Sequence, residues 1–215
     1  MVINLSLVFL NETHQKPTKK QPKFSYQALI GVFKQPIVGP AVLTGFLLTT
    51  AQFMMLIGFQ TFCSDQLKLT PTQIGIFYGG FGITGILMQL GIPLINKFIS
   101  SRPLILVIST VCCLAAMAYI GFTEAFIAFA TGIGVYGIFN GLRNPMLNAI
   151  IADNSKAAAE GEIMGINQSY TSIGQAIGPA LAGAATLISL SAAFYLSAAF
   201  ILAGLVTGLK LRQKA

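Results

Sequence analysis

Charged residues are scarce in this sequence, and that scarcity decides the class of protein. Only 9% of its 215 residues are Asp, Glu, Lys or Arg, while 54% are hydrophobic, whereas a soluble domain carries about 25% charged residues. The stretches without any charge cover residues 35–64, 69–96, 103–123, 125–142 and 163–209. A helix crosses the hydrocarbon core of a bilayer with about 20 apolar residues. The sequence therefore predicts an integral membrane protein.

Four of these stretches fit one crossing each, and the last is long enough for two, with a turn expected near residues 189–191. The predicted transmembrane helices cover residues 36–62, 72–96, 103–122, 125–150, 162–187 and 190–209. Only helices and closed barrels satisfy their backbone polar groups within lipid. The expected fold class is all-α, an integral membrane six-helix bundle that occupies residues 36–210.

Residues that carry enzyme and metal chemistry are also few. The one histidine, His14, lies in a predicted loop, and the three cysteines at positions 63, 112 and 113 lack metal-ligand spacing. The sequence has no HExxH motif, no phosphate-binding loop and no intramembrane aspartate pair. We expect no enzyme activity, no cofactor and no metal site. The net charge of +7 does not indicate nucleic-acid binding, because the basic residues lie between the predicted helices.

The basic residues concentrate on one side of the predicted membrane. If the six helices alternate in direction, twelve Lys and Arg residues fall on one side and Lys68 alone falls on the other. The positive-inside rule places the twelve, and with them both termini, in the cytoplasm. In this interpretation residues 11–35 form a basic cytoplasmic linker, residues 211–215 form a cytoplasmic tail, and the protein is a multi-pass protein of the plasma membrane.

Amide side chains divide the predicted helices into two kinds. They are frequent in the first, second, fourth and fifth helices, while the third and sixth carry only scattered Ser, Thr and Tyr. An amide that faces lipid leaves hydrogen bonds unmade, at a cost of several kcal/mol. We therefore expect the four amide-bearing helices to face protein or a wet cavity. The second and fifth helices are also glycine-rich with a late proline, Pro93 or Pro179, which favours a 3+3 inverted repeat.

The stretch 137–183, GIFNGLRNPMLNAIIADNSKAAAEGEIMGINQSYTSIGQAIGPALAG, contains a glycine-rich helix ending in an Asn-Pro pair at Asn144 and a G-Q-x-x-G-P run from Gly174. It resembles the tenth and eleventh helices of the major facilitator superfamily, and most of all its drug:proton antiporter branch. Residues 7–14, LVFLNETH, resemble the end of that family's sixth helix. We therefore interpret residues 1–10 as the stub of a preceding transmembrane helix, with a frayed amino terminus as the alternative.

The resemblance covers essentially the whole chain, as helices seven to twelve of a twelve-helix protein. It implies the carboxyl-terminal half of a transporter that works by alternating access and exports small, drug-like compounds with proton exchange. Its partners would be the lipid bilayer, a small-molecule substrate and a second six-helix half, either a missing amino-terminal half or a second copy. The alternatives are a stand-alone six-helix protein that homodimerises and a non-transporting membrane scaffold.

Carboxylates are missing from the depth of every predicted helix. Proton-coupled transport usually needs an ionisable group inside the membrane, where its protonation can be tied to conformation. If this protein exchanges protons, the coupling carboxylate must come from a missing amino-terminal half. The alternative is a facilitator without coupling.

Candidate pathway residues are the polar and aromatic side chains of the amide-bearing helices. They are Gln52, Phe53, Tyr78, Tyr136, Asn140, Ser172 and Gln175. Binding sites for small molecules combine apolar walls with a few polar side chains that hold the ligand. Gln52 and Asn140 lie near the middle of their predicted helices. The alternative is that these amides only hydrogen-bond a neighbouring helix. Asn144, Asn148 and Gln168 are expected to pair across the fourth and fifth helices or to line a cytoplasmic vestibule.

Arg143 lies towards the inner end of the fourth helix, and we considered two roles for it. It either pairs with Asp153 or Glu162 as an inner gate, or extends to the lipid headgroups. The prolines within the fourth and fifth helices, Pro145 and Pro179, predict kinks. Glycines 174 and 178 predict close helix packing.

Overall fold

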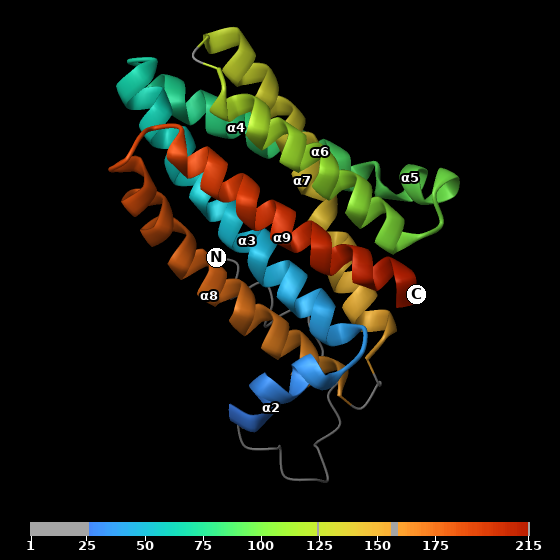
Figure 1. The fold of residues 1–215 in the computed structure, drawn as a ribbon. Helices are drawn as coiled ribbons and strands as arrows, with labels where there is room; N and C mark the ends of the chain where they lie inside the picture. The colour runs from blue at the N-terminus through green and yellow to red at the C-terminus, as the bar shows by residue number, and fades with distance from the viewer. Residues whose placement is uncertain (1–25, 124, 156–158, 215) are drawn as a thin grey trace, which may run out of the picture.

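The computed structural model describes residues 26–123, 125–155 and 159–214, and it is helical nearly throughout these residues. The six long helices are α3 (Val38–Thr61), α4 (Pro71–Leu90), α6 (Arg102–Gly121), α7 (Phe126–Asp153), α8 (Glu160–Thr186) and α9 (Ala192–Lys214). Four shorter elements accompany them: α2 (Tyr26–Gly31), η1 (Val32–Lys34), the π-helical turn η2 (Phe62–Gln66) and α5 (Ile92–Phe98). The long helices run roughly along one common direction in Figure 1. The predicted six-helix bundle is thus the observed architecture.

The helix starts follow from local sequence. Thr70 caps α4: its side chain accepts from the Gln73 backbone N–H, and the Gln73 side chain accepts from the Thr70 N–H at 2.8 Å. Pro71 then occupies the first turn, where a backbone N–H would have no helical partner. Ser101 caps α6 in a similar way by accepting from the Leu104 N–H. Polar residues with these capping roles therefore fix where the apolar helices begin.

The prediction of one continuous helix over residues 72–96 is wrong. The helix α4 ends at Leu90, and the separate helix α5 begins at Ile92, beyond Gly91. Pro93 lacks a backbone N–H and its ring interferes with the carbonyl four residues earlier, so a continuous helix is disfavoured there. In the observed structure Pro93 lies in the first turn of α5, where it is tolerated.

The two ends of the described chain are more helical than expected. Within the predicted linker, residues 26–34 form α2 and η1, and Tyr170 of α8 donates a hydrogen bond to the Leu29 carbonyl at 3.1 Å. At the carboxyl end α9 continues to Lys214 with Leu211 fully buried, because no Gly or Pro follows Gly208 to end the helix. The predicted stub, residues 1–10, and the linker up to residue 25 lie outside the described residues.

The long helices form two groups in chain order, α3, α4 and α6 in the first and α7, α8 and α9 in the second. The first helix of each group packs mainly against helices of the other group. The first helix of the first group, α3, packs mainly against α8 and α9 of the second group. The first helix of the second group, α7, packs mainly against α6 and α4 of the first group. Figure 1 shows α3 lying between α8 and α9. This reciprocal arrangement is the one that a 3+3 repeat is expected to produce.

Burial differs sharply among the long helices. In α4 no residue is buried, while α3 buries residues along its whole length. By length and apolarity, five of the described helices are able to cross a membrane: α3 with η2, α4, α6, α7 and α9. The helix α8 has 27 residues, long enough to cross, but its Asn, Gln, Ser and Thr side chains make it less apolar than the others. Its place as a sixth span rests on its packing along α3.

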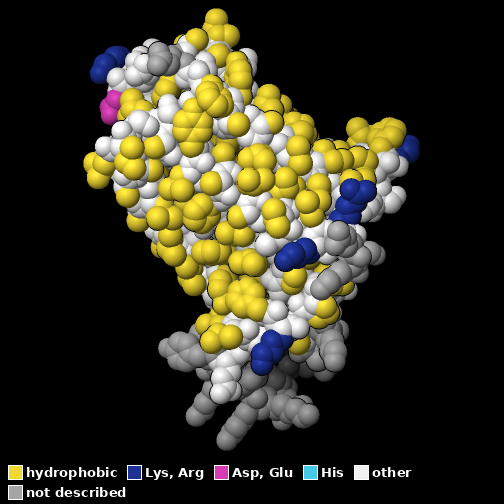
Figure 2. All heavy atoms as spheres, in the orientation of Figure 1, with side chains coloured by type: hydrophobic (Ala, Val, Ile, Leu, Met, Phe, Trp, Pro, Cys, Tyr) yellow, Lys and Arg dark blue, Asp and Glu magenta, His cyan; other side chains and the backbone are white. Residues whose placement is uncertain are grey.

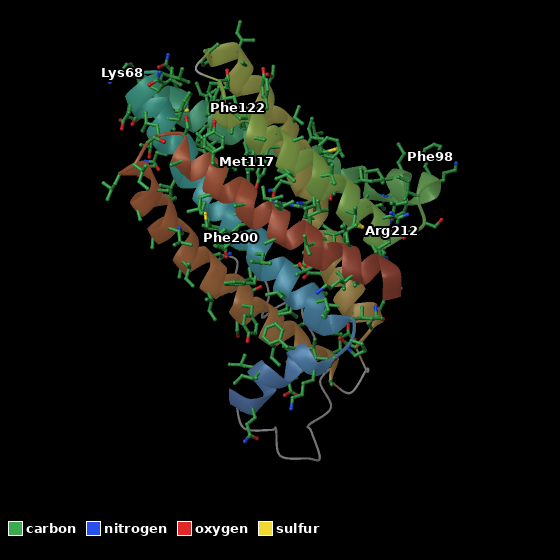
Figure 3. The ribbon with its side chains drawn as sticks, in the orientation of Figure 1. Lys68, Phe98, Met117, Phe122, Phe200 and Arg212 are labelled. Atoms are coloured by element: carbon green, nitrogen blue, oxygen red, sulfur yellow. The ribbon has the colours of Figure 1, made fainter. Side chains whose placement is uncertain are left out.

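The outer surface matches a membrane environment. Figure 2 shows hydrophobic side chains over the middle of the visible face, with basic side chains towards its lower and right-hand edges and one at the upper left. Figure 3 labels Lys68 near one end of the bundle, and Arg212 and Phe98 near the other. Lys68 therefore lies at the opposite end from Arg212, as the alternating helices predict.

Candidate functional site

A hollow of about 200 Å³ lies between α3, α4 and α7. Its polar lining is four amide side chains: Gln52 of α3, Gln89 of α4, and Asn140 and Asn144 of α7. The remaining lining consists of Phe81, Gly82, Gly85, Ile86, Gly137 and Gly141. The structure thus brings together Gln52 and Asn140, two predicted pathway residues that are 88 positions apart in the sequence. Apolar walls with a few amides are typical of small-molecule sites.

Two glycines of α7 allow α4 to approach closely enough to form this hollow. A Cβ atom on Gly141 would lie 2.8 Å from the carbonyl oxygen and 3.0 Å from the Cα of Gly85. A Cβ on Gly137 would lie 2.5 Å from the Thr84 hydroxyl oxygen. Position 141 requires glycine, because backbone atoms of Gly85 occupy the space that a side chain would need. At position 137 side-chain atoms of Thr84 and Phe81 occupy that space and would have to shift.

Arg143 lies in the core behind this hollow. Its side chain is only 2% exposed. The guanidinium Nη2 donates to the Tyr136 hydroxyl at 3.0 Å and to the amide oxygen of Asn140, and the guanidinium carbon lies 5.3 Å from the centre of the Tyr136 ring. Nε and Nη1 are buried and have no hydrogen-bond partner among the residues that the structure describes. Asn140 therefore connects the hollow to a buried cation whose hydrogen-bonding capacity is only partly used.

The predicted inner gate is not formed in this structure. Asp153 pairs with Arg102 at the start of α6, not with Arg143, and Glu162 is exposed on the first turn of α8. The reason is distance along the helix: Arg143 precedes Asp153 by ten residues of α7, about 15 Å at 1.5 Å per residue. The prediction that Arg143 extends to headgroups is also wrong, because the side chain is buried among helices.

A comparison with protein families decides the classification. The family model described as Major Facilitator Superfamily matches residues 5–214, nearly the whole chain. The chain belongs to this superfamily. Membership agrees with the all-α bundle and identifies the protein as a multi-pass membrane protein of a transporter family.

Curated relatives of this superfamily member include "Quinolone resistance protein NorA" of Staphylococcus aureus. The chain is 26% identical to the protein of strain MSSA476 over 210 residues, and 27% identical to that of strain MRSA252 over 210 residues. Each match covers 94% of this chain but only 52% of the relative. The chain thus spans about half the length of the curated relatives it matches.

Several other residues that the sequence predicts as pathway or packing residues lie outside the hollow. Phe53 packs against α8, where a Cβ on Gly178 would lie 2.8 Å from the Phe53 Cβ. Gly174 contacts α3 equally closely, since its Cβ would lie 2.9 Å from the Thr50 hydroxyl oxygen. The Tyr78 hydroxyl donates to the Leu56 carbonyl at 2.9 Å, and its ring lies 4.7 Å from that of Phe59. These four residues, Phe53, Tyr78, Gly174 and Gly178, do not line the hollow at Gln52.

The polar residues of α8 form a separate group. Ser172 is exposed and Gln175 is half-buried, and neither lines the hollow. Between α7 and α8, Asn167 donates to the Asn148 side chain at 3.2 Å, so the expected pairing across these helices uses Asn167 where Gln168 was predicted. The prolines at 145 and 179 lie inside α7 and α8, which continue past both of them.

Sequence reasoning missed several residues of the hollow. Gln89, Phe81 and Gly85 line the hollow but are not among the pathway residues that the sequence predicts. The four-residue spacing from Gly85 to Gln89 places both on one face of α4, and that spacing is the signal that could have identified them.

Proposed function

We propose that this chain is the carboxyl-terminal half of a transporter that exports small, drug-like molecules by alternating access. The observation that carries the proposal is the hollow lined by four amides within helices that lie in hydrocarbon. Unmet amide groups are costly in lipid, so their convergence around a cavity favours a polar pathway over simple packing. Membership of a transporter superfamily supports the same conclusion.

The pathway needs a second wall. The helix α4 buries no residue in this chain, and its exposed side chains include Ile83, Ile86 and Leu87. The hollow at Gln52 is only partly enclosed by α3, α4 and α7. A second six-helix half placed against α4 and α8 would close it. The match to about half of each relative supports a missing amino-terminal half, and a second copy of this chain is the alternative partner.

The substrate class follows from the relatives and the lining. The relatives carry the printed name of quinolone resistance proteins, and a mixed apolar and amide lining suits aromatic compounds with a few polar groups. The described carboxylates, Asp65, Asp153, Glu160 and Glu162, all lie at helix ends. In proton exchange the coupling carboxylate would therefore come from the partner half.

We further propose that the protein lies in the plasma membrane with both ends of the chain in the cytoplasm. The distribution of basic residues supports this orientation. Cysteines substituted for Lys68 and Lys97 test it with a membrane-impermeant thiol reagent on intact cells. Labelling at position 68 alone is expected, and labelling at position 97 alone would reverse the orientation.

Efflux of a fluorescent quinolone tests the transport function. Cells expressing the chain, with and without the sequence encoded upstream of it, are loaded and followed by fluorescence. We expect Gln52→Leu and Asn140→Leu to slow efflux while the protein still inserts. Gln60→Leu is the matched control, since Gln60 lies on α3 outside the hollow. Efflux that is equal in all variants, or absent from every wild-type preparation, would exclude the proposed function.

A further inference from the structure

The buried side of Arg143 lacks acceptors. A guanidinium carries five N–H groups and no acceptor of its own. Only Nη2 is bonded, to Tyr136 and Asn140, which leaves the N–H groups of Nε and Nη1 unbonded in a side chain that is 2% exposed. Both partners are neutral acceptors. The positive charge is therefore solvated by two oxygen atoms and one aromatic ring.

Such a charge is expensive without a counterion. Burying an unpaired ionised group costs several kcal/mol even after relaxation. No Asp or Glu in the described chain lies deep in a helix, and Asp153 is already paired with Arg102. A second copy of this chain would bring no further intramembrane carboxylate, because the sequence has none to offer. The counterion therefore has to come from outside these six helices.

The position of Arg143 shows how a counterion would reach it. Asn140 both lines the hollow and accepts from the guanidinium, so Arg143 is one hydrogen bond away from the hollow. The other lining groups are neutral amides, apolar side chains and glycines, and none of them repels an anion. Displacement of the Asn140 side chain is the route by which an anion in the hollow would reach the guanidinium.

We propose that Arg143 is the anchor for a carboxylate that enters through the hollow lined by Gln52 and Asn140. The planar guanidinium matches carboxylate geometry, and charge-assisted bonds of this kind are short and strong. The carboxylate belongs either to a substrate or to a side chain of a partner half. In the substrate case the inference rests on the proposed transport function and defines its substrates as organic acids or zwitterions.

Binding of 2-naphthoate to the purified full chain in detergent tests this anchor. The neutral 2-naphthamide, which has the same ring system, is the ligand control. We expect naphthoate, but not naphthamide, to raise the melting temperature. Arg143→Gln should weaken naphthoate binding by at least about tenfold, because the loss of a hydrogen bond to a charged group changes the affinity by at least that factor. Arg212→Gln removes an exposed arginine and is expected to leave binding unchanged. Equal binding of both ligands, or full binding by Arg143→Gln, would overturn the proposal.

Two further variants keep the test decisive if Arg143→Gln does not fold. Arg143→Lys retains the charge but loses the fork, and weaker naphthoate binding is expected. Asn140→Asp supplies an internal carboxylate to the guanidinium, so the melting temperature should rise while naphthoate binding is lost. An Asn140→Asp protein that melts lower than wild type and still binds naphthoate would contradict the proposal.

The source of the carboxylate is identified by comparing two preparations. The melting shift is measured in detergent and in native membranes, where any partner half is still present. A naphthoate shift in both preparations assigns the carboxylate to a substrate, while a shift in detergent alone assigns it to a partner side chain. If the wild-type chain binds naphthoate but no preparation of it exports quinolone, the proposed transport function is refuted, while the role of Arg143 as a carboxylate anchor is retained.

Discussion

Two arginines of this bundle have opposite surroundings. Arg102, at the start of α6, has a 41% exposed side chain and pairs with Asp153 at the end of α7. Arg143 lies ten residues before Asp153 on α7 and is buried, and its hydrogen-bond partners within the described part of the chain are Tyr136 and Asn140 alone. Within the described residues, the exposed Arg102 therefore has a carboxylate partner, while the buried Arg143 has none.

The difference indicates that the two residues serve different ends. An exposed ion pair contributes about 0–1 kcal/mol to stability, so Arg102 is expected to be nearly dispensable for folding. A buried arginine without a counterion lowers stability in the isolated chain. Its presence is understandable only if it does something that requires the charge. The predictions below test this division between a structural surface pair and a functional buried charge.

The largest effect is expected from Arg143→Met. Quinolone efflux should fall by more than about tenfold, because a charge-assisted contact is lost. The melting temperature in detergent should change by less than about 4 °C, since methionine removes the unpaired charge while leaving two oxygens without their donor. Efflux is measured in cells, and melting is measured on protein purified from the same culture. A collapse of the melting temperature would make Arg143 structural and erase the contrast with Arg102.

The close approach of α4 to α7 forms the wall of the hollow, and Gly141→Ala tests it. The new methyl group would lie 2.8 Å from the Gly85 carbonyl oxygen, so α4 must move. Overpacking of this kind costs about 1–3 kcal/mol, and a lower melting temperature and slower efflux are expected. The matched control is Gly134→Ala on the same helix, where nothing lies within 4 Å of the new atom. Equal effects at both positions would refute the role of the contact.

Tyr136→Phe removes one of the two acceptors of Arg143. A buried hydrogen bond to a charged group contributes about 1.5–3 kcal/mol, so we expect a lower melting temperature. Naphthoate should restore part of the loss, because its carboxylate offers a new acceptor. The melting temperature with and without naphthoate checks this. A variant as stable as wild type would show that the guanidinium does not depend on the hydroxyl.

The smallest effect is expected from Arg102→Gln and Asp153→Asn. Each should change stability by about 1 kcal/mol or less, and the change should shrink as salt is added. Melting curves at low and high salt measure it, with the double variant as the test of coupling between the two residues. A large, salt-independent loss would mean that the surface pair matters as much as the buried arginine.

Sequence alone predicted the architecture because lipid imposes a simple constraint on it. Uncharged stretches of the right length located all six long helices, and the positions of Lys68 and Arg212 at opposite ends follow from counting crossings. The break at Gly91 was missed, because the residues on both sides of Pro93 are apolar and were assigned to one uncharged span. The proline was taken as a feature within that helix, whereas it begins a new one. The extent of α9 was missed because the basic residues at its end are also good helix formers.

The site was harder to predict than the fold, because composition does not determine how a helix is rotated. Gln52 and Asn140 meet at the hollow, while Phe53, next to Gln52, faces α8. A shift of one residue turns a helical side chain by about 100°, so neighbours on one span reach different partners. Arg143 was misassigned for a related reason: its position near the inner end suggested Asp153, and only the packed structure reveals that the helices enclose it.

The exchange of contacts between the two groups of three helices has a consequence for biosynthesis. The hydroxyl of Ser197 in α9 donates to the carbonyl of Ala51 in α3 at 2.8 Å, across 146 positions of sequence. α3 is made before α4, α6 and α7, yet its main neighbours, α8 and α9, follow all three of these helices in the chain. Until α8 and α9 are made, α3 has to remain in the bilayer with the face that packs against them turned towards lipid or another protein. A chain that stops after α7 would keep that face uncovered, and quality-control proteases would be expected to recognise it.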